Sequence, residues 1–148
     1  DRALAADKLG KFKLLEQDLR KLIKMKPDSA HAYNALGYSL AERGSQLPEA
    51  LKLIKKAVEL SPEDPYIMDS LGWVHYRMGN LVEGLNYLNL AFAARPDAEI
   101  AAHLGEVLWM KGAKDDAKNI WRFALEKDPD NEVLLETLQR FIKKKIIE

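Results

Sequence analysis

The chain has 148 residues and no cysteine, and its 23 basic side chains balance its 23 acidic ones. With 47% hydrophobic and 31% charged residues, it is too apolar to remain disordered. The lack of cysteine excludes a thiol nucleophile, a thiolate zinc site and a disulfide, and neutrality argues against a general nucleic-acid binder. No uninterrupted apolar run approaches the ~18 residues needed to cross a membrane, so we expect one folded unit.

Charge is spread unevenly along the chain. Residues 29–140 carry 12 basic and 17 acidic side chains, whereas the flanking segments are net basic. Overall neutrality therefore hides an acidic middle. Because the sequence begins at Asp1 rather than Met, we expect a segment processed or excised from a longer protein.

Apolar residues return every three or four positions, which is the period of an amphipathic helix, and strand-like alternation is absent. In chain order, this pattern predicts helices over residues 2–9, 11–25, 29–43, 48–60, 64–78, 81–94, 98–111, 114–127 and 131–146. Glycines at 10, 44, 79 and 112 should each end a helix and open a turn. Prolines at 27, 62, 96 and 129 should stop the helix that follows that turn. The turn after Gly44 is one residue longer than the others.

The small residues recur at spacings of 33 to 35 residues. Leu-Gly pairs stand at 36–37, 71–72 and 104–105, and Ala50, Gly84 and Ala117 form a second series. Small residues inside helices let a neighbouring helix approach closely. The period therefore predicts repeated helical hairpins.

This unit resembles the tetratricopeptide repeat, a 34-residue helical hairpin with Leu-Gly, Ala, an aromatic residue, Ala and Pro at set spacings. The resemblance implies an all-α fold of helix-turn-helix repeats stacked into a right-handed superhelical solenoid. It divides the chain into a partial repeat over 1–29, complete repeats over 30–62, 63–96 and 97–129, and a capping helix over 130–148. In that last helix Leu138-Gln139 replaces Leu-Gly, and Glu136, Arg140, Lys143 and Lys144 are expected on its outer side.

The first helix of each hairpin in this family lines a concave groove, and the resemblance assigns the inward positions. The predicted partner-binding residues are Asn34, Tyr38, Glu42, Tyr66, Asp69, Trp73, Tyr76, Arg77, Glu106, Trp109 and Met110. We interpret Trp73, Trp109 and the tyrosines as anchors for a partner, the alternative being that they pack between helices. Trp121 and Phe123 lie on a second helix, so we expect them in the core.

The groove is also predicted to be acidic, because Glu42, Asp69, Glu99 and Glu106 occupy it with Arg77 as the main basic exception. We therefore expect the groove to bind a basic or mixed-charge peptide better than an acidic one. The alternative is a solvated face with pairing between successive helical turns.

Catalytic and metal-binding patterns are missing from the sequence. His103 and Glu106 share one helix face, but no third metal ligand accompanies them. No phosphate-binding loop and no serine between glycines occurs. We therefore expect no enzyme activity, no cofactor, no metal, no small-molecule substrate and no nucleic-acid partner.

A narrower resemblance concerns residues 69–73, 101–106, 120–121 and 128–131, which are similar to the last repeats of proteobacterial tetratricopeptide proteins. Several of those are outer-membrane lipoproteins that act as adaptors in the periplasm. The resemblance implies a non-catalytic adaptor of the cell envelope that binds a peptide or helix of a partner protein, with a cytoplasmic location as the alternative. The competing functions are an oligomerisation or scaffold segment that makes its contact through the uncapped N-terminal edge or the convex face, and an accessory domain of a larger enzyme.

Overall fold

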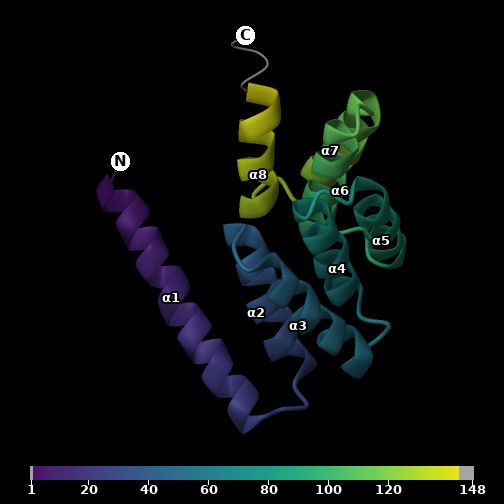
Figure 1. The fold of residues 1–148 in the computed structure, drawn as a ribbon. Coiled ribbons are helices and arrows are strands. Elements are labelled where there is room, and N and C mark those ends of the chain that lie inside the picture. The colour runs from purple at the N-terminus through teal and green to yellow at the C-terminus, as the bar shows by residue number, and fades with distance from the viewer. Residues whose placement is uncertain (1, 144–148) are drawn as a thin grey trace.

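A computed structural model of the chain describes residues 2–143, and all regular elements in that part are helical (Figure 1). They are α1 (Arg2–Met25), α2 (Ala30–Arg43), α3 (Leu47–Leu60), α4 (Pro65–Arg77), α5 (Leu81–Ala94), α6 (Ala98–Met110), α7 (Lys114–Lys127), α8 (Glu132–Leu138) and a π-helical turn, η1 (Gln139–Lys143). The all-α prediction is confirmed, and α2 to α7 begin and end within one residue of the predicted bounds. Residues 144–146 of the predicted last helix lie outside the described residues.

The helices α2–α3, α4–α5 and α6–α7 form three hairpins that stack one after another (Figure 1). Each hairpin turns at a glycine with left-handed backbone, namely Gly44, Gly79 and Gly112, with φ of 73°, 91° and 101°. The longer first turn accommodates its extra residue at Gln46, which also has positive φ, at 52°.

Inside the hairpins the two helices approach almost to backbone contact. A methyl group built on Gly72 of α4 would lie 2.8 Å from Leu88 Cγ and 2.9 Å from the carbonyl oxygen of Gly84. Only glycine allows this approach, which explains why Leu-Gly recurs along the chain.

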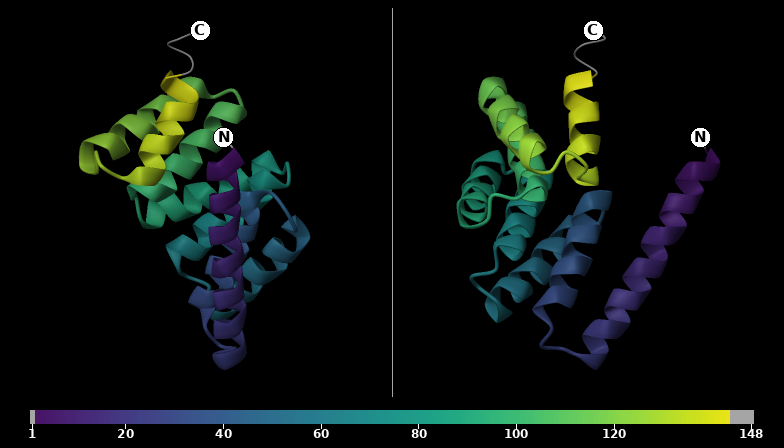
Figure 2. Two further views of the ribbon diagram at one scale, coloured as in Figure 1. Left: turned by 90° about the vertical axis from the view of Figure 1, so that its left-hand side faces the viewer. Right: turned by 180° about the vertical axis from the view of Figure 1, so that it is seen from behind.

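The N-terminal segment differs from its prediction, since α1 is one continuous helix rather than two helices joined at Gly10. Gly10 is exposed, and a methyl group there would meet no other atom within 4 Å. A hairpin turn is stabilised by apolar faces packing on each other, whereas the contact from α2 near this stretch is the charged Arg43 side chain over the Phe12 ring. Leu19 is buried near the C-terminal end of α1, which lies close to α2, while the N-terminal end diverges (Figure 2).

The last helix also departs from the repeat. Within the preceding hairpin, helices α4 and α6 each pack mainly on the second helix, which is α3 for α4 and α5 for α6. Helix α8 instead packs mainly on α6, the first helix of the preceding hairpin, and less on α7. Figures 1 and 2 show α8 beside α6, on the side of the molecule that faces α1. Thus α8 lies against the row formed by the first helices.

The hydrophobic core runs between the stacked hairpins. Trp121 is 1% exposed, as expected of a core residue, but Phe123 is 40% exposed and meets Phe92 only edge-on. Within residues 2–143, no helix has the length and apolarity that crossing a lipid bilayer requires.

Candidate partner-binding groove

The first helices α2, α4 and α6 lie side by side, and side chains near their starts line a pocket of about 480 Å³. The helix starts are fixed by capping side chains. Asp64 accepts a hydrogen bond from the Tyr66 backbone N–H at 2.8 Å, and Asp97 accepts one from the Ile100 N–H at 2.9 Å. Capping thereby places two carboxylates at the rim of this pocket, which we call the acidic pocket.

Tyr66 connects two repeats across the acidic pocket. Its hydroxyl donates to Asp97 Oδ2 at 2.7 Å and accepts from the Nε–H of Arg95, also at 2.7 Å. The Arg95 guanidinium also lies over the Tyr66 ring, 5.5 Å from its centroid. These contacts fix one wall of the pocket.

Glu99 contributes the carboxylate with fewest partners. It is half-buried in the pocket wall, and no hydrogen bond or ion pair to it occurs among the described residues. Burial raises the pKa of Glu99 above its ordinary value; His103 opposes this shift, and the carboxylates of Asp69 and Asp97 add to it. A cation entering the pocket would therefore relieve repulsion among neighbouring acidic groups.

A buried polar network lies at the pocket floor. His103 is 3% exposed, and its Nδ1 lies 2.9 Å from Asp69 Oδ1. The Tyr38 hydroxyl lies 3.1 Å from the other ring nitrogen of His103 and donates to Glu42 at 2.8 Å. Burial alone would lower the pKa of His103, but the carboxylates of Asp69, Glu42 and Glu99 together outweigh burial and raise it. The network therefore ties α2, α4 and α6 together.

The other half of the concave face is closed by α8. Trp73 is 2% exposed and stacks on the His103 ring with a centroid separation of 4.2 Å. Only about 50 Å³ of space remains between these rings and the covering helix, with Thr137 and Arg140 among its lining residues.

An ion pair holds this cover in place. Arg140 donates to Glu106 at 2.7 Å, and the Tyr76 hydroxyl donates to the same carboxylate at 2.8 Å. Glu106 is 4% exposed, and a buried carboxylate needs such partners. The expectation that Arg140 lies on the outer side of the last helix is therefore corrected, because its side chain reaches Glu106 across the closed cavity; Glu136 borders the same cavity and is exposed. Lys144 and the Lys143 side chain lie outside the described residues.

The predicted groove residues separate into three sets. The acidic pocket includes Asn34, Tyr38, Tyr66 and Asp69. Glu42, Trp73, Tyr76 and Glu106 lie around the contact with α8. Trp109, Arg77 and Met110 lie elsewhere.

The prediction that Trp73, Asp69 and Glu106 are exposed in the groove is wrong. Packing among the first helices and under α8 leaves each of them with 4% exposure or less.

The third set faces away from the acidic pocket. The Nε–H of Arg77 donates to the Ala41 carbonyl at 3.0 Å, so this side chain caps the end of α2. Trp109 is half-buried against Trp121, with ring centroids 5.7 Å apart. Met110 is 54% exposed and stays a predicted contact residue.

Some pocket residues were missed by the sequence prediction. Asp64 and Asp97 precede their helices, so the inward positions of the helix itself do not include them. Their signal is an acidic residue at the N-cap of successive first helices. His103 and Glu106, adjacent on the helix face, diverge to different partners, and no group of ligands suited to a metal ion occurs among the described residues.

Comparison with known proteins agrees with this architecture. The tetratricopeptide repeat model matches residues 1–65 and 70–132. A TPR repeat-containing protein of Pseudomonas aeruginosa, PA4667, is 49% identical over 105 residues, which is 71% of this chain but 18% of that protein. The chain thus spans under a fifth of this relative's length.

Two solved structures show the same fold. TTC0263, a thermophilic TPR protein of Thermus thermophilus, superposes with a TM-score of 0.76 at 23% identity, covering 94% of this chain and 75% of that one. MamA from Desulfovibrio magneticus RS-1 superposes with a TM-score of 0.65 at 21% identity, covering 87% and 73%. The repeat pattern, the stacked hairpins and these matches together show that the chain belongs to the tetratricopeptide repeat family.

Proposed function

We propose that this chain is a non-catalytic interaction module that binds a lysine- or arginine-rich segment of a partner protein in the acidic pocket. Tetratricopeptide proteins in general are protein-interaction modules, and this much holds for the family. The proposal that the bound segment is rich in lysine or arginine rests on the charge and shape of the acidic pocket.

The observation that carries the proposal is a concave site in which carboxylates outnumber the nearby cations, which are Arg95, bound to the Tyr66 hydroxyl, and the His103 ring beside Asp69. Asp64, Asp97 and Glu99 line the pocket, and His31 is its only basic lining residue among those the structure describes. A volume of about 480 Å³ lies within the range of ordinary binding pockets. Cationic side chains of a bound segment would complement these carboxylates and accelerate encounter.

Asn34 offers a second recognition element. Its Oδ1 atom is buried at the pocket wall and has no hydrogen-bond partner. Such an orphaned acceptor is costly in a folded protein. Because this atom is covered in the free chain, the Asn34 amide would have to turn toward the pocket to accept from a backbone N–H of a bound segment, as recognition of an extended peptide requires.

The experiment compares ten-residue fluorescein-labelled peptides that are lysine-rich, glutamate-rich or neutral, by fluorescence anisotropy. The lysine-rich peptide should bind, and binding should weaken at high salt because of ionic screening. Replacing Glu99 by glutamine keeps the shape and removes the charge, so the dissociation constant should rise about tenfold or more.

Glu126→Gln, at an exposed position on α7 outside the acidic pocket, is the matched control and should bind as the wild type does. Equal binding of all three peptides, no binding of the lysine-rich one, or an unchanged affinity in Glu99→Gln would contradict the proposal.

Self-association through the N-terminal edge is a second candidate, favoured by a specific observation. On α1, Leu9, Leu14 and Met25 are 44%, 63% and 69% exposed, so this helix offers apolar surface to a second copy. The oligomeric state of the chain in solution decides this candidate. A location at the cell envelope likewise remains a proposal, supported by the resemblance to envelope adaptors.

A further inference from the structure

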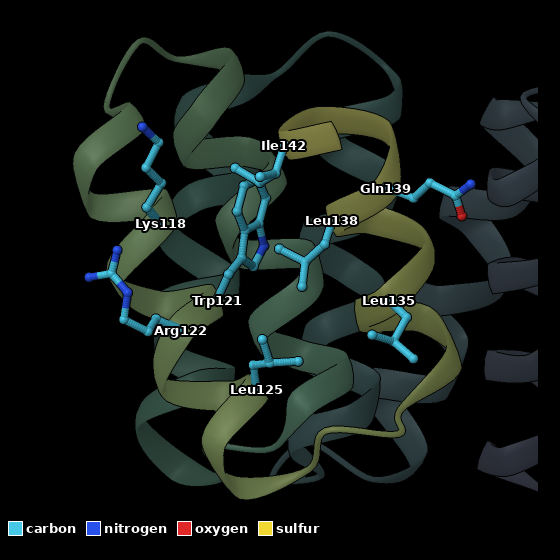
Figure 3. Close-up of a pocket in the computed structure, with 8 residues that line it drawn as sticks. All are labelled: Lys118, Trp121, Arg122, Leu125, Leu135, Leu138, Gln139 and Ile142. Atoms are coloured by element: carbon cyan, nitrogen blue, oxygen red, sulfur yellow. The ribbon is translucent and has the colours of Figure 1, made fainter. Parts of the chain in front are cut away.

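A second pocket, of about 620 Å³, lies between α7 and α8 (Figure 3). We call it the apolar pocket. Figure 3 shows Trp121 and Leu125 on α7, and Leu135 and Leu138 on α8, around one shared space. Leu135 is 43% exposed there. Large apolar side chains that converge on an open space mark a surface that another element can cover.

The chain itself shows what covers such a surface. One repeat earlier, the angle between α5 and α6 is filled by α7. Ile120 of α7 packs in one cluster with Leu88 of α5 and Leu104 of α6. Phe123, also on α7, meets Phe92 of α5 with ring centroids 6.1 Å apart. An amphipathic helix therefore occupies the preceding angle.

The repeat register carries this arrangement forward. Trp121 lies 33 residues after Leu88, and Leu138 lies 34 residues after Leu104, so the two pairs occupy equivalent positions. By register the apolar pocket corresponds to the next angle in the series, although α8 packs on α7 less extensively than α6 packs on α5. Among residues 2–143, no helix fills it.

The pocket differs from its predecessor in one respect. Gln139 stands where the earlier first helices have glycine, and it lines the pocket. At Gly72, even a methyl group would lie 2.8 Å from the facing helix. A helix seated beside α8 must therefore stay farther away, and it needs large apolar side chains to reach Leu135 and Leu138.

Charge specifies the occupant further. Lys118 and Arg122 of α7 line the pocket, and neither forms an ion pair with a described residue. A second copy of this chain would offer α1, whose exposed leucines are apolar enough. However, α1 is rich in lysine and would bring like charges to this rim. Complementarity instead requires acidic residues beside the apolar stripe.

We propose that the apolar pocket is a docking site for an amphipathic helix of a partner protein, with large apolar residues on one face and acidic residues flanking them. The helix would extend the stack by one position, as α7 does for α5 and α6. This site is separate from the acidic pocket, and the two bind segments of opposite charge.

The test uses a stapled helical peptide based on residues 114–127, the segment that fills the preceding angle. An acidic version has every lysine and arginine replaced by glutamate, and a basic version has every aspartate and glutamate replaced by lysine. Fluorescence anisotropy should show the acidic version binding at least tenfold more tightly. Leu135→Asp should weaken it at least tenfold, and Arg122→Glu should remove the preference between the versions.

Leu90→Asp is the matched control, since Leu90 is 59% exposed on α5 outside the pocket. It should bind the acidic version as the wild type does, and circular dichroism should show all variants folded. Glu99→Gln should leave this binding unchanged, which separates it from the acidic pocket.

Any of four results would overturn the proposal, and the first three concern the peptides. The acidic version fails to bind, both versions bind equally, or Leu135→Asp binds as tightly as Leu90→Asp. A wild-type oligomer that Leu135→Asp dissociates would assign the pocket to a second copy, and would overturn it as well.

Discussion

The concave face has two halves that are built from the same helices but differ in access. Near the helix starts, the acidic pocket is open and measures about 480 Å³. Farther along, beneath α8, only about 50 Å³ remains and Trp73 is 2% exposed. Repeat positions on α4 and α6 contribute to both halves, so the repeat pattern does not explain why one half is open and the other closed. The placement of α8 over one half explains it.

What holds α8 against the closed half is a combination of apolar burial and one compensated charge. Leu134 is fully buried, and Arg140 pairs with the buried carboxylate of Glu106. Removing the helix would expose Leu134's contact surface and leave Glu106 with only the Tyr76 hydroxyl. The closed half is therefore a property of the last helix, and each of the following changes tests it.

The largest effect should come from ending the chain at residue 130. Truncating a buried leucine alone costs about 2–5 kcal/mol, and this change removes a whole docked helix. We expect the melting temperature to fall by about 10 °C or more and the 1–130 fragment to aggregate. Acrylamide should quench its tryptophan fluorescence more strongly. Unchanged solubility, melting and quenching would show that α8 does not cover this face.

Replacing Trp73 by alanine tests the closed half without removing its cover. Because Trp73 is buried and stacked on His103, the loss should be about 3–5 kcal/mol of unfolding free energy, similar to that of Trp121→Ala. Urea unfolding measures both.

Met110→Ala is the control for Trp73→Ala, because Met110 is 54% exposed and its truncation should change stability by about 0.5 kcal/mol or less. A Trp73→Ala loss as small as that of Met110→Ala would place Trp73 on an open surface, as the sequence alone had suggested.

The sequence predicted the three hairpins well because several local signals agree there. The apolar period, the glycine turns such as Gly44 and the proline stops such as Pro96 all mark the same boundaries. Where one signal stood alone it failed. Gly10 has the spacing of a turn, but the contact from α2 near it is a charged side chain rather than an apolar face, and the helix continues through it.

Access to the groove could not be predicted from repeat positions. Trp73 has an inward position in its repeat, and that position is buried because the ring packs on His103 and Tyr76 and α8 docks over it. The sequence of α8 and η1 is compatible with an outward Arg140, and the inward orientation becomes clear only from the buried Glu106, which needs a cation. These are contacts between residues 34 positions apart, which the helical period of either segment does not encode.

The smallest effect concerns the boundary between the two halves, where His103 touches both. If Tyr38 donates its proton to Glu42, it can only accept from His103, so a doubly protonated ring satisfies both contacts. The Asp69 carboxylate faces the other ring nitrogen at 2.9 Å. This geometry favours the imidazolium, in agreement with a pKa of His103 above its usual value.

The sign of the pH dependence follows from these shifts. A raised pKa in the folded state means that the folded chain binds protons more tightly, so the stability from His103 is fully present below about pH 6.5 and is lost as pH rises through the folded value. Burial also raises the pKa of Asp69, whose contribution therefore declines with rising pH as well. Both groups give the same direction.

We therefore expect the unfolding free energy, measured in urea, to fall as pH rises from about 6.5, with a slope of at most about 1.4 kcal/mol per pH unit for the one proton that His103 loses. The double variant Asp69→Asn/His103→Gln keeps a polar pair that does not titrate, so its slope should be flatter than that of the wild type. Other groups, including His31 and His75, are present in both proteins and cancel in this comparison. Parallel slopes would mean that His103 is neutral in the folded chain, and that the polar contact joining the two halves of the groove forms without a charge.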